Sequence, residues 1–319
     1  MGADAGHQST EVRRAEGRHL GEPFATLDEK EGDEQMRWSP GGTSRNIEDR
    51  RGSSGGFGGM APMGIGGTIV LLVLSLIFGR DFIGGSSGDT QSPQTSAGEV
   101  APPADQSPEE QREVQFVSFV LDSAQAVWSR VAPQKLGTDW HDAKLVLFRD
   151  GTQTGCGVGQ TAMGPFYCPN DQKVYLDLSF LDELKTRFGA PGEFAQAYVI
   201  AHELGHHVQH LSGLDQQVRR AQQNNSGDAN ALSVRLELQA DCYAGVFGHE
   251  MQSENILDPK DLDDGLRAAA AVGDDRLQKE ATGRVTPDSF THGTSAQRAN
   301  WFRRGFDTGD PKSCNTFDQ

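Results

Sequence analysis

The stretch AYVIAHELGHHVQHLSG, residues 197–213, carries four histidines and one glutamate among small and apolar residues. On an α-helix, positions four apart share one face, so His202 and His206 project together from adjacent turns. Two imidazoles at this spacing can hold one Zn²⁺ ion, while Glu203, one position further round the helix, points beside the ion. A carboxylate in that place suits the general base of a hydrolytic reaction, so the spacing predicts a zinc-dependent hydrolase.

The alternative is a chance His-Glu-x-x-His pattern on a solvated helix face. The surrounding residues argue against it, because the AYVIA segment before His202 is largely apolar and predicts a buried helix. Unpaired imidazoles in such a helix would be costly without a partner such as a metal ion. Gly205 lowers helix propensity, which predicts that another backbone or a ligand approaches the helix closely at that position.

A catalytic zinc ion needs three protein ligands and one open position. The metzincin pattern would require glycine at position 209 and histidine at position 212, where the chain has Gln209 and Ser212. The segment LELQAD instead offers Glu237 as the third ligand, which is the gluzincin-type arrangement. Asp241, one turn later, would accept a hydrogen bond from the outer nitrogen of a ligating histidine. Because Glu-x-x-x-Asp is common on helices, this assignment depends on the neighbouring His-Glu-x-x-His helix.

Other polar side chains near this motif have weaker claims to a role. His207 leaves the ligand face, which indicates a structural or solvated imidazole. His210 is the rival third ligand, but three ligands on one helix would spread over about 12 Å, too far for one ion. His292, in a predicted loop, could donate a hydrogen bond to the oxyanion of a scissile carbonyl, or be an ordinary surface histidine. Tyr198 and Tyr243 are alternative donors, although tyrosines on apolar helices usually belong to the core.

Hydrophobic periodicity indicates the elements that must position these groups. One helix is predicted over residues 193–213, and a second covers ALSVRLELQADCYAGVFGHEM. AKLVLF and KVYLDLSF predict two strands of a small sheet, the second being a candidate edge along which an extended peptide could pair. The polar residues 214–231 are expected to be mostly loop and to help set substrate preference. Thr294 and Gln297 predict a capping box on the last helix, and the expected fold is α+β, mainly helical.

The cysteines indicate an oxidising compartment. The chain has four of them, all after residue 150: Cys156, Cys168, Cys242 and Cys314. An even count outside the cytoplasm predicts two disulfides with three possible connectivities. The favoured pairs are Cys156–Cys168, closing a short loop, and Cys242–Cys314, tying the C-terminal tail to a helix. Free buried thiols are the alternative, and the lack of a C-x-x-C pair argues against a cysteine-based zinc site.

Residues 60–79 contain no charged side chain, and about 20 apolar residues span a hydrocarbon core. A transmembrane helix is therefore predicted at residues 60–80. Arg45, Arg50 and Arg51 precede it, so the positive-inside rule places the N-terminus in the cytoplasm and the C-terminal domain in the periplasm or outside the cell. The alternative is a cleaved signal peptide, but the run is longer than a usual h-region and no A-x-A site follows it.

Composition divides the remainder of the chain. Residues 1–59 are rich in Gly, Ser, Arg and acidic groups and are predicted to be a disordered cytoplasmic tail. Residues 81–108 have the composition of a flexible linker, and residues 109–319 are long enough to bury one substantial core. The formal net charge of −16 makes the chain a poor partner for nucleic acid and for anionic lipid headgroups.

Several segments together closely resemble the neutral zinc metallopeptidase family of bacterial membrane-anchored proteins. They are HELGHHVQ, RLELQADCYAGVF, GPFYCPNDQKVYLDLSF, GAPGEFAQAYVIAHE and DSFTHGTSAQRANWFRRGF. The resemblance runs from about Met36 to the C-terminus, and His202, Glu203 and His206 match the family's zinc motif. It implies a single N-terminal membrane span and a zincin-like exported domain. It also makes Met36 a candidate start, with residues 1–35 as an extension before it.

These observations lead to one expected activity and two alternatives. We expect a membrane-anchored metallopeptidase with one Zn²⁺ ion, peptide or protein substrates and no nucleic-acid partner. The first alternative is a non-catalytic, zinc-stabilised binding or adaptor module at the cell envelope, in which His292 or His210 would close the metal site as fourth ligand. The second is a zinc amidase acting on cell-wall peptide bonds, for which the sequence offers no sugar-binding signal.

Overall fold

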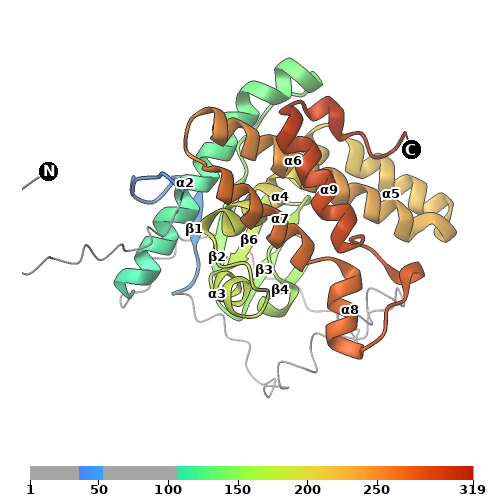
Figure 1. Ribbon diagram of the computed structural model, residues 1–319, viewed down its shortest axis with the longest axis horizontal. Helices are drawn as coiled ribbons and strands as arrows, with labels where there is room; N and C mark the ends of the chain where they lie inside the picture. Colours follow the sequence, from blue (N-terminus) through green and yellow to red (C-terminus); the bar gives the residue numbers. More distant parts are fainter. Residues whose placement is uncertain (1–35, 53–105, 319) are drawn as a thin grey trace, which may run out of the picture. The chain divides into compact units, whose positions relative to one another are not determined.

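The computed structural model describes residues 36–52 and 106–318 (Figure 1). The predicted membrane span at residues 60–80, the extension at residues 1–35 and nearly all of the linker at residues 81–108 lie outside these residues. Within the two described ranges, no helix combines the length and the apolar character needed to cross a membrane.

Helices make up most of the described fold. Helix α2 begins at Pro108, where the side chain of Ser107 caps the first turn, and buries an apolar stripe that ends at Val131. Helix α4 packs against α6 and α7, and α9 packs against the same two helices. The helices are α2 (Pro108–Val131), α3 (Ser179–Thr186), α4 (Glu193–Leu211), α5 (Leu214–Asn224), α6 (Ala229–Ser253), α7 (Pro259–Ala271), α8 (Asp274–Thr282) and α9 (Ser295–Thr308). The predicted capping box of the last helix is present, because Thr294 and Gln297 bond to each other's backbone.

A four-stranded sheet has the order β1-β2-β6-β5. Its strands are β1 (Ile47–Asp49), β2 (Lys144–Phe148), β6 (Lys173–Asp177) and β5 (Phe166–Cys168). β1, β2 and β6 run parallel, whereas β5 is antiparallel to β6. A separate hairpin joins β3 (Gly151–Thr154) to β4 (Gly157–Gln160). The predicted combination of many helices and a small sheet is therefore confirmed.

The sheet corrects one expectation about its edge. β6, the KVYLD segment, lies between β2 and β5 and so cannot offer a free edge. The edge beside it is β5, a three-residue strand that the sequence patterns did not predict. A strand of three residues, bounded by Pro165 and Pro169, is too short to show the alternation by which strands are recognised in a sequence.

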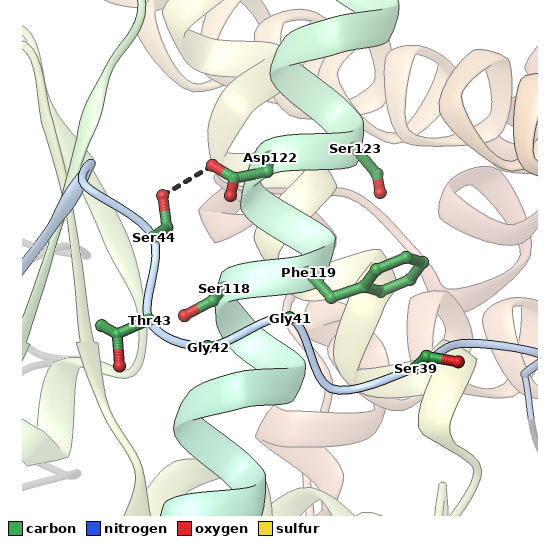
Figure 2. A pocket seen from close by; sticks show the side chains of 9 residues that line it. All are labelled: Ser39, Gly41, Gly42, Thr43, Ser44, Ser118, Phe119, Asp122 and Ser123. Atoms are coloured by element: carbon green, nitrogen blue, oxygen red, sulfur yellow. Dashed lines mark hydrogen bonds between the residues drawn. The ribbon is translucent and has the colours of Figure 1, made fainter.

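Residues 36–52, which we call the N-terminal strap, belong to the fold, so the prediction of disorder throughout residues 1–59 is wrong for them. Met36 is 4% exposed, and Trp38 packs against two aromatic rings of α2. Figure 2 shows the strap crossing α2, where the Ser44 hydroxyl donates a 2.6 Å hydrogen bond to Asp122. Few apolar residues suffice here because β2 and α2 supply the surfaces that the strap itself lacks.

A cavity of about 170 Å³ lies in the seam between the strap and α2 (Figure 2). Its lining consists of strap residues and of side chains from α2, such as Ser118 and Phe119, and includes none of the predicted metal ligands. The cavity is therefore a feature of this seam and separate from the predicted site.

Residues 214–231 also differ from the expected loop. Helix α5 follows Gly213, whose φ of 75° turns the chain out of α4, and continues to Asn224. Only one side chain of α5, Val218, is buried. The helix contains few apolar residues, and this polar composition explains why the sequence indicated mostly loop.

Both favoured disulfides are present. The Cys156–Cys168 bond joins the β3–β4 turn to β5, and the Cys242–Cys314 bond joins α6 to the C-terminal tail. All four cysteines of the chain are thus paired.

Candidate metal centre

Helices α4 and α6 form the site by packing closely at Gly205. A Cβ atom placed on Gly205 would lie 3.1 Å from both the Cα and the carbonyl oxygen of Ala240 on α6. The close approach predicted from this glycine is confirmed, and the approaching group is a helix backbone. This packing places Glu237 of α6 opposite His202 and His206 of α4.

The three predicted ligands lie close enough together to share one metal ion. Nε2 of His202 is 3.2 Å from one carboxylate oxygen of Glu237, and Nε2 of His206 is 3.4 Å from the other. Within the described residues, one donor atom from each of the three side chains lies within 4.8 Å of the other two. Tetrahedral zinc ligands at 2.0–2.1 Å from the ion are about 3.4 Å apart. The donor set and its spacing therefore fit one zinc ion.

The outer nitrogen of each imidazole is held by a different partner. Nδ1 of His202 donates to Asp241 at 2.9 Å, in the place where the sequence analysis expected this acceptor. Nδ1 of His206 donates to the side-chain oxygen of Gln209 at 2.9 Å, and the Gln209 amide donates to the Leu236 carbonyl at 2.8 Å. In the neutral form of each ring, Nε2 is thereby left as the acceptor, and it faces Glu237. Gln209 had served only to exclude the metzincin pattern, although its i, i+3 spacing from His206 permits this contact.

A buried arginine that the sequence analysis did not single out completes the support. Arg298 of α9 is 4% exposed and donates to both carboxylate oxygens of Asp241, at 2.8 and 2.9 Å. Asp241 also accepts a 2.5 Å hydrogen bond from the Tyr198 hydroxyl. The capping box at the start of α9 was a signal that this helix is fixed in place, but nothing in the sequence indicates which helix Arg298 faces.

Electrostatics prepare Glu237 to bind a cation. Burial raises its pKa, but His206, His292 and His202 together hold that pKa well below its usual range. Burial lowers the pKa of His202, yet Asp241 and Glu237 raise it to about 10 when no cation is present. Because a ligating imidazole must be neutral, a metal ion binding here would displace the proton of His202.

Glu203, the predicted general base, lies next to His202 on α4 and is 7% exposed. Within residues 36–52 and 106–318, no group donates a hydrogen bond to its carboxylate. A buried carboxylate without a protein donor remains free to accept a proton from water or substrate.

His292 lies in the loop before α9 and interacts electrostatically with Glu237. Its Nδ1 lies 3.3 Å from Asp274, whose other oxygen accepts the backbone N–H groups of Thr291, His292 and Gly293. Burial lowers the pKa of His292, but the charges of Glu237 and Asp274 raise it. With Nδ1 directed at Asp274, Nε2 is the nitrogen available to a ligand.

The remaining candidates are engaged elsewhere. His207 is fully buried, with Nδ1 2.8 Å from the Tyr167 hydroxyl and Nε2 2.7 Å from the His141 carbonyl. His210 pairs with Asp215 and is not among the three clustered ligands. Tyr198 donates to Asp241, and Tyr243 packs edge-on against Trp128. The two tyrosines are structural, as expected for apolar helices.

Comparison with known proteins places this chain in a family. The family described as "putative neutral zinc metallopeptidase" matches residues 36–317. YpfJ of Escherichia coli K12, an uncharacterized protein, is 51% identical over 290 residues, which cover 88% of this chain and 99% of that protein. Rv2575 of Mycobacterium tuberculosis H37Rv, also uncharacterized, is 45% identical over 207 residues, covering 61% of this chain and 68% of that protein. No solved structure matches.

Proposed function

Because the chain belongs to the neutral zinc metallopeptidase family, we propose that it is a zinc-dependent peptidase with Glu203 as its general base. One observation carries the proposal. The two imidazole Nε2 atoms and the Glu237 carboxylate converge, and the residue that follows His202 is a buried glutamate to which no described residue donates. A purely structural metal site would not need that glutamate.

The residues have separate tasks in this reaction. His202, His206 and Glu237 would hold the ion, which supplies Lewis-acid polarisation of the scissile carbonyl and lowers the pKa of water at the site. Glu203 accepts the proton of the attacking water and delivers it to the leaving amine. His292, fixed through Nδ1 by Asp274, donates from Nε2 to the oxygen on which negative charge develops.

Strand β5 is the proposed docking edge for an extended substrate. In the described sheet its one strand neighbour is β6, so its other side can pair with a peptide. The edge is fixed to the metal-binding helix, because the Tyr167 hydroxyl of β5 donates to Nδ1 of His207 on α4 at 2.8 Å. An extended peptide on β5 would therefore run alongside α4, with its backbone held by main-chain hydrogen bonds.

Attachment to the cell membrane through residues 60–80 also remains our proposal. Two disulfides support an oxidising location for residues 106–318, in the periplasm or outside the cell. The zincin-like and gluzincin-type assignments are proposed on the basis of the His202, His206 and Glu237 cluster.

Cleavage by the zinc-loaded full chain, compared with the Glu203→Gln variant on a peptide library, tests the proposal. Loss of a general base is expected to lower the rate by about 10²–10⁴-fold while zinc stays bound at one ion per chain. Glu183→Gln, at a partly exposed glutamate on α3, is the matched control and should cleave like the wild type. Equal cleavage by wild type and Glu203→Gln would contradict the proposal, and a zinc-bound wild type that cleaves nothing would favour the adaptor alternative.

A further inference from the structure

Arg298 places a buried positive charge between two carboxylates of α6. Its side chain donates to both oxygens of Asp241, and its Nη2 lies 3.9 Å from Glu237. Its Nη1 donates to the Val272 carbonyl at 3.1 Å, which fixes the third side of the guanidinium. One rigid group thus contacts the acceptor that orients His202 and approaches the carboxylate that would bind the ion.

Asp241 needs this partner because it is fully buried. A carboxylate removed from water is stable only when its oxygens are hydrogen-bonded and its charge is compensated. The two-point contact with a planar guanidinium also fixes the plane of the carboxylate. That plane determines where the oxygen shared by Tyr198 and His202 points, and so how the His202 ring is turned.

The position of Arg298 is imposed by backbone contact between α6 and α9. A Cβ atom on Gly305 of α9 would lie 1.9 Å from the Cys242 carbonyl oxygen, next to Asp241. In the same way, a Cβ atom on Gly245 of α6 would lie 2.0 Å from the Phe302 carbonyl oxygen. Only glycine permits these approaches, so α9 cannot move away without losing them.

We propose that Arg298 is a positioning residue for the metal centre, which holds Asp241 so that His202 presents Nε2 to the ion. The inference rests on the zinc site of the proposed function and adds a determinant of its affinity. Removing Arg298 should therefore weaken zinc binding as loss of an outer-shell partner does, by about 10–100-fold.

The test measures zinc affinity of the full chain by chelator competition, alongside unfolding of the metal-free protein. Arg298→Met should lose about 10–100-fold in affinity, and Arg298→Lys should recover part of that loss because it keeps the charge. In an Asp241→Asn background, Arg298→Met should cost little more, since the two residues act as one unit. Cobalt substituted for zinc should show an altered absorption spectrum in Arg298→Met.

Arg51→Met is the matched control, because Arg51 is a buried arginine paired with Asp49 and Glu110 in the strap. It should lower stability and leave zinc affinity unchanged. If Arg298→Met binds zinc like the wild type, the inference is wrong. If Arg298→Met does not fold, Asp241→Asn takes its place, and zinc affinity equal to the wild type in Asp241→Asn would also overturn the inference. A wild type that binds no zinc would refute the proposed function instead.

The strap carries a second, independent inference. β1 pairs in parallel with β2 along Ile47–Asp49, and the flanking Leu145 N–H donates to the Asn46 carbonyl at 2.8 Å. Arg51 has a fully buried side chain bonded to Glu110 of α2 at 2.8 Å. These contacts require the strap and residues 106–318 to meet in one folded unit.

The predicted membrane span separates these two parts in the sequence. A single crossing between residues 52 and 106 would leave them on opposite faces of a bilayer about 30 Å thick, where β1 could not pair with β2. Two of the three arginines used for the orientation are also occupied, since Arg50 pairs with Glu48 and Arg51 with Asp49. We infer that residues 36–52 and 106–318 lie in the same compartment. This revises the predicted cytoplasmic placement of the strap, and it limits the proposal for residues 60–80 to membrane attachment without a single crossing.

An engineered cross-link in the full chain tests this inference in cells. Ser44→Cys with Asp122→Cys replaces a hydrogen-bonded pair, and the two cysteines should form a disulfide seen by mass spectrometry. Thr43→Cys and Ser129→Cys, made singly at exposed positions, should react with a membrane-impermeant maleimide from the same side. Labelling of Ser129→Cys alone in intact cells, with Thr43→Cys labelled only after lysis, would overturn the inference.

Discussion

Each imidazole of the proposed metal centre is held at both ring nitrogens. Asp241 fixes the outer nitrogen of His202 and Gln209 that of His206, so that both rings turn Nε2 toward Glu237. A cation that binds there meets donors already in position, which limits the ordering cost of binding. At the scale of residues, zinc affinity depends on two kinds of side chain: those that would contact the ion and those that orient the ligands.

The first prediction separates a ligand from a neighbouring histidine. Glu237→Ala removes one of three donors, so zinc affinity should fall by more than the 10–100-fold expected for an outer-shell change. His210→Ala should bind zinc like the wild type, because His210 pairs with Asp215 and lies outside the ligand cluster. Chelator competition measures both variants. A comparable loss in His210→Ala would show that the ligand set has been assigned incorrectly.

The sequence permitted the prediction of those contacts that helix periodicity alone determines. His202, Glu203 and His206 lie on one helix, so their relative positions follow from 3.6 residues per turn. Arg298 lies 57 residues beyond Asp241, and its partner depends on how α9 packs against α6. That packing is decided by glycine contacts between helices, which no local pattern in one sequence reveals.

Helix α4 serves two elements through opposite sides. One side approaches α6 at Gly205 and forms the metal centre, while His207 connects α4 to β5 and to the segment after α2. The proposed docking edge and the proposed ligands are thus attached to the same helix. A change in how His207 is bonded should therefore affect the anchoring of β5.

The second prediction concerns the dependence of stability on pH. Burial lowers the pKa of His207 from 6.5 to about 4, since both ring nitrogens are bonded in the neutral form. Between those values the unfolded chain binds the proton and the folded chain does not, so the free energy of unfolding falls as pH falls. Replacing His207 by Gln should therefore cost about 1–2 kcal/mol less at pH 5 than at pH 7.

The measurement compares unfolding of the two proteins in chelator at both pH values. The comparison between proteins is needed because Asp261, whose pKa burial raises to about 6, acts in the opposite direction. Its folded form binds more protons between its usual value and 6, which stabilises the fold as pH falls. An equal cost of His207→Gln at both pH values would mean that His207 is protonated in the folded chain.

At the scale of elements, sequence patterns located the long helices and the two apolar strands and missed the short or polar ones. β2 and β6 are buried along most of their length, so their apolar runs are evident. β5 has only three residues, and α5 is largely polar with one buried side chain, so neither has an apolar run that marks it in the sequence. Both form because of contacts with neighbouring elements: β5 pairs with β6, and α5 packs against α4 and α6.

In the folded unit, segments distant in the sequence contact α4, the helix that carries two of the proposed ligands. The Cys242–Cys314 disulfide ties the C-terminal tail to α6, directly after Asp241. At the other end, the Trp38 indole donates to Glu193 in the first turn of α4 at 3.0 Å, and the Arg37 N–H donates to the Ile256 carbonyl at 2.8 Å. The strap therefore braces the N-terminal end of the helix that carries the proposed ligands.

The third prediction follows from this bracing. A chain lacking residues 1–52 loses the buried Met36 and the partly buried Trp38, and it leaves the β2 edge without its parallel partner. Burial of a large apolar side chain is worth about 1.5–3 kcal/mol, from which the cost of ordering the strap must be subtracted. We expect a net loss of about 2–4 kcal/mol, which lowers the melting temperature by roughly 5–10 °C in a domain of this size.

A chain lacking only residues 1–35 is the control, because it retains the whole strap. If the folded unit begins at the strap, this chain should have the same melting temperature as the full chain, both with zinc and in chelator. Zinc affinity of the chain lacking residues 1–52 distinguishes two roles of the strap. If the strap holds the start of α4 in place, its loss should also disturb His202, further along that helix, and lower zinc affinity. If the strap only adds buried surface, stability should fall and zinc affinity should not. Identical melting of the two shortened chains would mean that β1 adds nothing to the sheet, and the argument that the strap shares a compartment with residues 106–318 would lose its physical basis.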